Sequence, residues 1–327
     1  MKPSRNLARA LARTLAALSL GAASAAWAGP FQGGIVTLIT PASSGSSFDN
    51  AARALADGLA KTWGIPVVVN NRPGAATILA TSVAAKAAPD GRTILLSVTP
   101  TIQAPFLSTK LDYDPVTSFA PVAQMFDARL WLAVNTQVPA RTVKEFVALA
   151  KAPNAKFAYS SPGNGSTPHL NASQLAHQAR IEMLHVPYKG VAPAVVDLAA
   201  GMVTATFASY SDLVPHVQSG RVRILASTGA ERSPLSRDVP TMKEAGYADF
   251  ETVGFGGLVV PAGTPQPLVD EISRDVIKVL AQPEVKGRLI TLGLEPHSQG
   301  PAEFGKLIVA QTAYWKKVIK DADVKPE

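Results

Sequence analysis

The fold is decided by a stretch near the middle of the chain, which reads Tyr159-Ser160-Ser161-Pro162-Gly163-Asn164-Gly165-Ser166-Thr167-Pro168-His169-Leu170. A short strand is expected over 156–159, and glycines and hydroxyl side chains follow it. Thr167 and Pro168 are expected to be the N-cap and first residue of a helix, because a hydroxyl accepts an unpaired helix N–H and proline has none. Such a start presents N–H groups and a positive dipole end, which suits a carboxylate or a phosphate. An ordinary strand-to-helix turn fits the same residues.

A second unit of this kind opens the folded part of the chain. Residues 35–39 have the pattern of a buried strand, and a turn rich in hydroxyls follows at 40–47. Apolar residues then recur at helical spacing from Phe48 to Trp63. This loop has the same physical character as the stretch at 159–170.

Strands alternate with helices along most of the chain, which predicts parallel sheets. Further strands are expected at 66–70, 93–98, 183–186, 204–207 and 223–226. Ligands bind at the carboxyl ends of parallel strands in open sheets. The loops at 43–47, 99–101 and 160–166 all follow such ends.

Two longer extended segments predict a division into two lobes. One runs from 119 to 134 with an interruption at 127–129, and the other covers 252–260. We expect an α/β clamshell in which each lobe is a mainly parallel sheet flanked by helices. Residues 29–128 and 257–327 form lobe 1, and 129–256 form lobe 2. Lobes joined by two extended crossings close around a ligand by hinge motion.

Residues 1–28 are interpreted as a secretory signal peptide. Basic residues precede an apolar run from Leu15 to Ala26 that is too short to span a bilayer, and Ala26-Trp27-Ala28 resembles a cleavage site. An uncleaved membrane anchor is the alternative. Export and cleavage after Ala28 would place the protein in the periplasm, as a soluble chain of about 300 residues.

Charge and cysteine content exclude several functions. The first 28 residues carry four basic residues and no acidic one, so the net charge of +7 falls to +3 without them. No Lys/Arg-rich run occurs, and nucleic-acid binding has no support. The chain has no cysteine, which excludes a catalytic thiol, a disulfide and a Cys-based metal site.

Common catalytic motifs are also missing from the sequence. There is no G-x-S-x-G elbow, no P-loop and no H-E-x-x-H, and Gly254-Phe255-Gly256-Gly257 lacks the spacing of a dinucleotide fingerprint. The five histidines are scattered without metal-ligand spacing. We therefore expect no metal, no cofactor and no enzyme.

Seven short motifs in order resemble one known family, the Bug-type (TctC-like) extracytoplasmic receptors of tripartite tricarboxylate transporters. The resemblance covers essentially all of the chain after residue 28. The motifs are Asn71-Arg72-Pro73-Gly74-Ala75, Ala87-Ala88-Pro89-Asp90-Gly91, the run 113–122, Gly163-Asn164-Gly165-Ser166-x-x-His169-Leu170, Val186-Pro187-Tyr188-Lys189-Gly190, Asp238-Val239-Pro240-Thr241 and Pro261-Ala262-Gly263-Thr264-Pro265.

This resemblance implies a two-lobed receptor with the fold of periplasmic binding proteins. Such a receptor captures a small organic carboxylate between its lobes and presents it to a membrane permease, and we expect it to act as a monomer. In the family, one ligand carboxylate is held by main-chain groups, hydroxyls and water of two loops. Carried over, these are 43–47 with Asp49 in lobe 1 and 161–166 with His169 in lobe 2.

The chain departs from the family pattern in two places. The first loop usually has a Pro-aromatic pair and Gly-Gly, whereas this chain has Pro41-Ala42 and Gly45-Ser46, with Phe48 where a small residue is common. The pocket should therefore be richer in hydroxyls and different in shape. The second departure is Ala208-Ser209, where members often have Asp-Asn. Its lack of an acid argues against an amino-acid ligand.

Several candidate residues have a structural alternative. Asp49 either orders the first loop or favours the helix dipole, and His169 either contacts ligand or packs locally. Phe48 and Tyr210 either stack on a ligand or belong to the core. Two cations remain: Lys189 attracts an anion or is a solvated surface residue, and Arg129 is a candidate for a distal carboxylate.

The predicted ligand-binding residues lie in the loops that follow strand ends. They are Ser43, Ser44, Gly45, Ser46, Ser47, Phe48, Asp49, Thr99, Thr101, Ser161, Gly163, Asn164, Gly165, Ser166, His169, Ser209 and Tyr210. We expect a mono-, di- or aromatic carboxylate to be captured for transport. Two alternatives stay open, a periplasmic hydrolase or isomerase using Ser44 or Ser46 with His169, and a sensory receptor for the same ligand.

Overall fold

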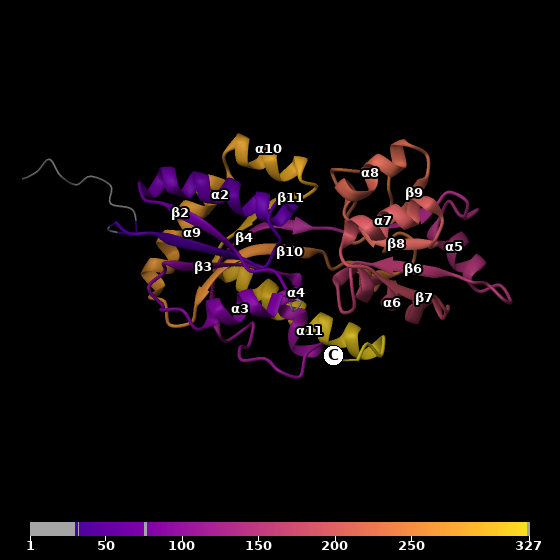
Figure 1. The fold of residues 1–327 in the computed structure, drawn as a ribbon, viewed down its shortest axis with the longest axis horizontal. Coiled ribbons are helices and arrows are strands. Elements are labelled where there is room, and N and C mark those ends of the chain that lie inside the picture. Colours follow the sequence, from indigo (N-terminus) through magenta and orange to yellow (C-terminus); the bar gives the residue numbers. More distant parts are fainter. Residues whose placement is uncertain (1–29, 32, 75–76, 326–327) are drawn as a thin grey trace, which may run out of the picture.

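The computed structural model describes residues 30–31, 33–74 and 77–325, and it folds into two lobes, each built on one sheet (Figure 1). The signal peptide expected at 1–28 lies outside these residues. The two lobes lie side by side along the long axis of the molecule, and the last helix runs beneath them both (Figure 1). The expected two-lobed α/β fold is therefore present.

The first lobe is organised around a six-stranded sheet in the order β11-β4-β10-β3-β1-β2. Its strands are β1 Val36–Thr40, β2 Val67–Asn71, β3 Thr93–Val98, β4 Phe119–Ala128, β10 Gly254–Pro261 and β11 Glu295–Gln299. Its helices are α2 Ser47–Trp63, α3 Ile78–Ala85, α4 Thr99–Gln103, the short 3₁₀ turn η2 Ala104–Phe106, α9 Gln266–Leu280, α10 Pro283–Thr291 and α11 Pro301–Asp321.

The second lobe is organised around a five-stranded sheet in the order β7-β6-β8-β5-β9. Its strands are β5 Trp131–Asn135, β6 Ala158–Ser161, β7 Leu184–Pro187, β8 Ala205–Ala208 and β9 Val222–Ser227. Its helices are α5 Val143–Ala150, α6 Thr167–Ala179, α7 Val191–Ala200, α8 Tyr210–Gln218 and the 3₁₀ turn η3 Ala248–Phe250.

Both sheets are mixed, although most strands of each sheet run in one direction, as expected. In the first lobe β1 pairs with β2 and β3 in parallel, but β10 is antiparallel to β3 and β4, and β11 is antiparallel to β4. In the second lobe β5 is antiparallel to both of its neighbours. The strands that run against the others are β10 and β11 in the first lobe and β5 in the second, and β5 and β10 are the strands that directly follow the two crossings. Alternation of strands and helices detects only the parallel units.

The chain crosses between the sheets twice. It leaves the first sheet at the end of β4, Ala128, and enters the second with β5 at Trp131. It returns through η3 to β10, which starts at Gly254. The expected interruption at 127–129 therefore falls slightly too early, because β4 continues through Asp127 and Ala128 in register with β10.

Each lobe buries its own apolar core. In the first lobe, α2 places Leu55, Leu59 and Trp63 against the sheet, and the sheet contributes wholly buried residues such as Ile94. The second lobe buries a separate set around Phe146 and Phe207. Each lobe therefore has an apolar core of its own.

Two elements were not predicted from the sequence. The strand β11, Glu-Pro-His-Ser-Gln at 295–299, has no strand-like alternation and is held in place by pairing with β4. The residues 99–101, expected as a loop, instead form the first turn of α4. The strand expected at 156–159 is also displaced, since β6 covers Ala158–Ser161.

Candidate functional site

The first loop is held in shape by hydrogen bonds to its own helix. Gly45 has a φ of +82°, which favours glycine, and its N–H donates to Asp49 Oδ2 at 2.8 Å. Ser46 is the N-cap of α2, and its Oγ accepts from the N–H of Asp49 at 3.4 Å. The loop and the first turn of α2 thus form one closed unit.

Asp49 is the residue that fixes this unit. Its side chain is buried, and besides Gly45 it accepts hydrogen bonds from Asn71 Nδ2 at 2.7 Å and from Arg53 Nε at 3.0 Å. Burial acts to raise the pKa of Asp49, but hydrogen bonds from Arg53, Asn71 and Gly45 outweigh it and hold that pKa below its ordinary value. Of the two roles considered for Asp49, the geometry matches ordering of the loop.

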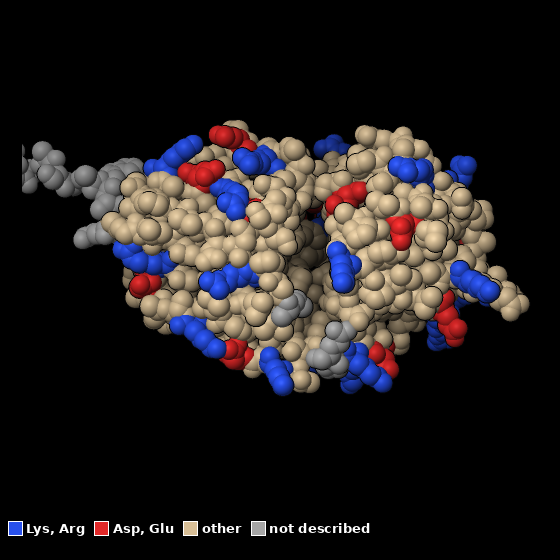
Figure 2. Space-filling view, viewed as in Figure 1, with Lys and Arg blue, Asp and Glu red and all other residues tan. Residues whose placement is uncertain are grey.

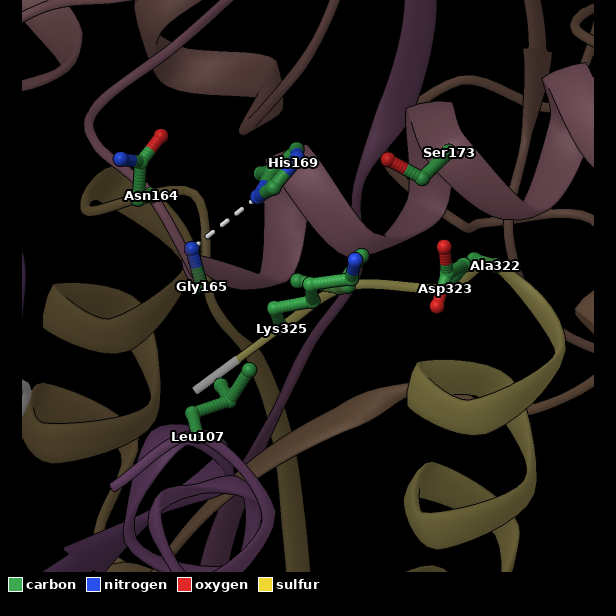
Figure 3. Close-up of a pocket in the computed structure, with 9 residues that line it drawn as sticks. Leu107, Asn164, Gly165, His169, Ser173, Ala322, Asp323 and Lys325 are labelled. Carbon is green, nitrogen blue, oxygen red and sulfur yellow. Dashed lines mark hydrogen bonds between the residues drawn. The ribbon is translucent and has the colours of Figure 1, made fainter. Parts of the chain in front are cut away.

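The second loop repeats this arrangement in the other lobe. Gly165 has a φ of +67°, and its N–H donates to His169 Nδ1 at 3.0 Å (Figure 3). Ser166 is the N-cap of α6, and its Oγ accepts from the N–H of His169 at 3.4 Å. The N-cap is therefore Ser166 and not Thr167, which is the first helical residue. The sequence Ser166-Thr167-Pro168 allows either hydroxyl to cap, and the turn of Gly165 decides between them.

His169 is held neutral by its surroundings. It is only 8% exposed, and its ring stacks on that of His185 with centroids 3.9 Å apart and planes inclined by 4°. Tyr159 stacks on His185 at 4.9 Å, and His185 Nε2 lies 2.7 Å from Ser161 Oγ. Burial, together with the charge that His185 would carry, lowers the pKa of His169 to about 4. A neutral ring leaves Nδ1 free to accept from Gly165.

Two adjoining cavities of about 280 and 420 Å³ lie between the lobes, and we call them together the interlobe cleft. Figure 2 shows it as a groove whose visible walls are mostly uncharged. Both cavities are lined by Phe48, Ala128, Leu130, Val191, Ser209 and Asp212. One also contacts Thr99, Pro100, Pro162, Ser166, Thr167, Pro168, Ala208, Gly254 and Phe255, and the other Gly45, Ser46, Ser47, Arg129, Leu292, Gly293 and Leu294.

Part of the predicted site lines this cleft. Those residues are Gly45, Ser46, Ser47, Phe48, Thr99, Ser166 and Ser209. They come from the starts of α2, α4, α6 and α8, which meet between the lobes (Figure 1). The sequence-based expectation that strand-end loops come together therefore agrees with the arrangement of these residues.

Other predicted residues are placed elsewhere. Ser43 and Ser44 are exposed and line neither cavity. Thr101 and Ser161 are buried, and their hydroxyls bond to the main chain at Val98 and Gly163. Tyr210 packs on Trp131 with ring centroids 5.3 Å apart, which agrees with the alternative that Tyr210 belongs to the core and does not stack on a ligand. The turn residue Gly163 lines neither cavity.

A further cavity of about 430 Å³ lies on the other side of the second loop (Figure 3). Asn164, Gly165 and His169 face it, together with Leu107 of the first lobe and the chain after α11, residues 322–325. His169 thus faces this cavity and not the interlobe cleft. The hydrogen bond between His169 and Gly165 connects this cavity to the second loop, whose Ser166 lines the interlobe cleft.

Sequence reasoning missed several residues of the cleft. Asp212 follows Ser209 at the spacing of a capping box, a signal that was available. Its N–H donates to Ser209 Oγ at 3.3 Å, and Ser209 Oγ donates to Asp212 Oδ2 at 2.5 Å. Val191 starts a helix directly after the motif that ends at Gly190. Leu130 and Phe255 carried no local signal, because only the crossing of the lobes brings them to the cleft.

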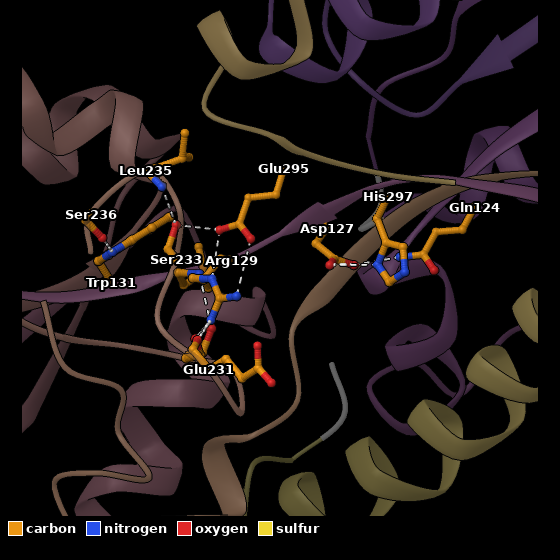
Figure 4. Close-up of polar contacts among 12 residues, drawn as sticks. Gln124, Asp127, Arg129, Trp131, Glu231, Ser233, Leu235, Ser236, Glu295 and His297 are labelled. Carbon is orange, nitrogen blue, oxygen red and sulfur yellow. Dashed lines mark hydrogen bonds and ion pairs between the residues drawn. The ribbon is translucent and has the colours of Figure 1, made fainter. Parts of the chain in front are cut away.

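Arg129 does not reach toward the cleft with a free guanidinium. Its Nε and Nη2 donate to Glu295 at 2.8 and 3.3 Å, and its Nη1 donates to the carbonyls of Thr228 and Glu231 (Figure 4). Ser233 Oγ also donates to Glu295 Oε1, at 2.7 Å. The suggestion that Arg129 meets a distal carboxylate is therefore wrong for this structure. Arg129 instead ties the first crossing to β11 and to the second lobe.

Two polar residues of the motif at 186–190 also have clear surroundings. Tyr188 donates to Asp197 Oδ2 at 2.6 Å, and burial together with that carboxylate raises its pKa to about 12. Lys189 is exposed and lines neither cavity of the cleft.

Phe48 connects the cleft to the first sheet. Its ring stacks on Phe126 with centroids 5.5 Å apart, and Phe126 lies directly on Gly256, where a Cβ would come within 2.1 Å of the ring. The neighbouring Gly257 similarly leaves room for Phe304 on the opposite face. Gly256 and Gly257 thus make room for aromatic rings, whereas a Cβ at Gly254 would meet the carbonyl of Ala128 and the hydroxyl of Thr99.

The hydrolase alternative finds no assembled site. Ser46 lines the interlobe cleft and Ser44 does not, while His169 faces the other cavity and accepts from Gly165. Among the described residues no group of His, Cys, Asp or Glu is placed to hold a metal ion. Within the same residues no helix is both long and apolar enough to cross a membrane.

Comparison with known proteins identifies the family. Residues 51–324 match the family model of the tripartite tricarboxylate transporter family receptor, TctC. The chain belongs to this receptor family. The solved structure of the periplasmic binding protein BugD is 32% identical, with a TM-score of 0.76 over 90% of this chain and 99% of that one.

Two further solved structures of the same fold contain ligands. Rpa4515 of R. palustris, solved with adipate, is 31% identical with a TM-score of 0.78, over 89% of this chain and 98% of that one. MatC of Rhodopseudomonas palustris, solved with bound malate, is 30% identical with a TM-score of 0.75, over 87% and 98%. These likenesses confirm the two-lobed receptor fold that the motifs predicted.

Proposed function

We propose that this chain captures a small organic carboxylate in the interlobe cleft and delivers it to the membrane permease subunits of a tripartite transporter. The observation that carries the proposal is the pair of matched helix starts, Ser46 in one lobe and Ser166 in the other, which open on adjoining cavities. Main-chain N–H groups at helix starts bind carboxylates well. Adipate and malate in two solved relatives are carboxylates of this size.

The start of α6 is the best-placed anchor for the ligand carboxylate. The first turns of α2 and α8 hold Asp49 and Asp212, whereas the first turn of α6 holds no acid. Its nearest titratable side chain, His169, is neutral at pH 7 because its pKa is lowered to about 4. The positive end of the α6 dipole is therefore the least compensated of the three.

The remaining parts of the proposal concern the setting of the receptor. We propose that residues 1–28 direct export and are cleaved after Ala28, that the mature chain works in the periplasm as a monomer, and that it releases its ligand unchanged. The division into lobes is proposed near residue 129 and near residue 253, because β10 joins the first sheet from Gly254 onward. This return lies slightly before the boundary expected at 257.

A thermal-shift screen tests the proposed function. Carboxylates of two to eight carbons are compared with the matched amides, and the bound compound is recovered and analysed by mass spectrometry. A true ligand at 100 times its Kd stabilises the protein by about 2.7 kcal/mol. We expect shifts with acids, none with amides, and recovery of the acid unchanged. Stabilisation by sugars or amines alone would contradict the proposal.

A further inference from the structure

We propose that the ligand of this chain is a monocarboxylate with an apolar body, and that dicarboxylates are discriminated against. This inference rests on the proposed function and specifies its substrate class. The relatives solved with adipate and malate hold dicarboxylates. The lining of the cleft in this chain differs from what a second carboxylate needs.

The cleft offers main-chain N–H groups at its helix starts to the ligand carboxylate but no available cation to a second one. Among the described residues that line its two cavities, Arg129 is the only basic side chain. Four of its N–H groups are already taken by Glu295 and by the carbonyls of Thr228 and Glu231. Releasing Arg129 to a ligand would leave Glu295 buried with Ser233 alone, which costs several kcal/mol.

An acid in the cleft opposes a second negative charge. Asp212 lines both cavities, so a ligand that extends from one into the other passes beside it. Ser209 is the hydroxyl that donates to its carboxylate, and no cation is paired with Asp212 among the ion pairs of the described residues. A ligand carboxylate near an unneutralised carboxylate is repelled and poorly solvated.

The rest of the lining suits an apolar body. Phe48, Leu130, Val191 and Phe255 contribute aromatic and aliphatic surface to the cavity of about 280 Å³. The same cavity is bounded by Pro100, Pro162 and Pro168, and a proline has no N–H to donate. This wall therefore favours apolar contact and offers no cation to a second carboxylate.

Isothermal titration at pH 7.5 with matched pairs tests the inference. Hexanoate is compared with adipate and benzoate with terephthalate, and 6-aminohexanoate is added to detect a cation at Asp212. We expect each monocarboxylate to bind at least tenfold more tightly than its dicarboxylate. Tighter binding of adipate, terephthalate or 6-aminohexanoate overturns the inference but leaves the proposed function standing. If none of these acids and no other carboxylate of two to eight carbons binds, the proposed function itself fails.

Variants locate the source of the discrimination. Asp212→Asn keeps the size and capping ability of the side chain, and we expect it to reduce the hexanoate preference over adipate at least threefold. Asp57→Asn removes the same charge from the exposed side of α2 and should leave the preference unchanged. Lys189→Gln is expected to change neither the affinity for hexanoate nor the affinity for adipate. An unchanged preference in Asp212→Asn would show that Asp212 does not exclude dicarboxylates, and loss of adipate binding in Lys189→Gln would reveal a cation that serves a second carboxylate.

Discussion

The main-chain N–H of Gly165 donates to Nδ1 of His169 at 3.0 Å, four residues further along the chain. Gly45 and Asp49 form the equivalent contact in the other lobe, at 2.8 Å. In each lobe, the main-chain N–H of one glycine thus donates to a side chain in the first turn of the following helix. The partners differ in one respect: Asp49 is charged, whereas His169 accepts only while its ring is neutral.

Acidification should therefore open the second loop before the first. The pKa of His169 is lowered to about 4 in the fold from its ordinary 6.5, so the unfolded chain binds the extra proton between these values. Stability then falls as the pH drops from 6.5 to 4, by about 3 kcal/mol if the full shift is expressed. It is unaffected above pH 6.5. Urea unfolding between pH 4 and 7.5 measures the effect.

His169→Asn is the matched control for this prediction. The amide oxygen of asparagine can replace Nδ1 as acceptor for Gly165 and does not titrate. The variant should bind hexanoate like the wild type at pH 7.5 and lose less stability and affinity toward pH 4. Titration of the ligand itself affects both proteins equally. Identical pH profiles in the two proteins would show that His169 does not set the response.

Alanine at Gly45 or Gly165 should weaken ligand binding beyond its effect on stability. Both glycines have a positive φ, which costs roughly 1–2 kcal/mol for alanine. Gly64 has a φ of +66° at the end of α2, and a Cβ there meets nothing within 4 Å. Gly64→Ala should therefore lose similar stability and keep its affinity. Equal affinity in all three variants, measured by titration, would place the carboxylate away from these loops.

The ion pair of Arg129 with Glu295 should be worth far more than an exposed one. Arg129→Met leaves Glu295 buried without its partner, and we expect the free energy of unfolding to fall by about 3–5 kcal/mol. Arg232→Met breaks the pair with Glu244, in which the two side chains are 45% and 44% exposed, and should lower the free energy of unfolding far less than Arg129→Met does. Urea unfolding measures both losses of stability. Similar losses in the two variants would argue that the Arg129–Glu295 pair does not hold the first crossing against β11 and the second lobe.

Gly256→Ala should disturb the cleft from within the sheet. The Cβ of alanine would collide with the ring of Phe126, which stacks on Phe48 at the cleft. We therefore expect a loss of about 1–3 kcal/mol in the free energy of unfolding, together with weaker ligand binding. Gly287→Ala lies in α10 with nothing near its Cβ and should stabilise by about 1 kcal/mol. Normal affinity of Gly256→Ala would show that Phe48 does not depend on Phe126.

Local features of the site were predictable from the sequence, and long-range ones were not. Glycine and serine before Asp49 and His169 identify two helix starts, because those residue types act within a few positions of each other. The exposure of Ser43 and Ser44 depends on backbone angles that no sequence pattern fixes. The pairing of β11 with β4, and hence the partner of Arg129, depends on residues more than 150 positions apart.

The same distinction explains the lining of the cleft. Phe48 and Ser166 belong to motifs that can be read locally. Leu130 and Phe255 reach the cleft only because both crossings pass beside it. The apolar character of the cleft, on which the proposed ligand class depends, therefore appears in the fold and not in any single stretch.

A crystal structure of the protein with hexanoate would locate the ligand carboxylate and the alkyl chain in one measurement. We expect the carboxylate at the start of α6, within hydrogen-bond distance of the N–H of Thr167, because Pro168 has no N–H and the N–H of His169 donates to Ser166. The alkyl chain should then run along Phe48, Leu130 and Val191, with Arg129 still paired to Glu295. A carboxylate bound outside the interlobe cleft, or one held by Arg129 after release from Glu295, would refute both the proposed anchor and the proposed ligand class.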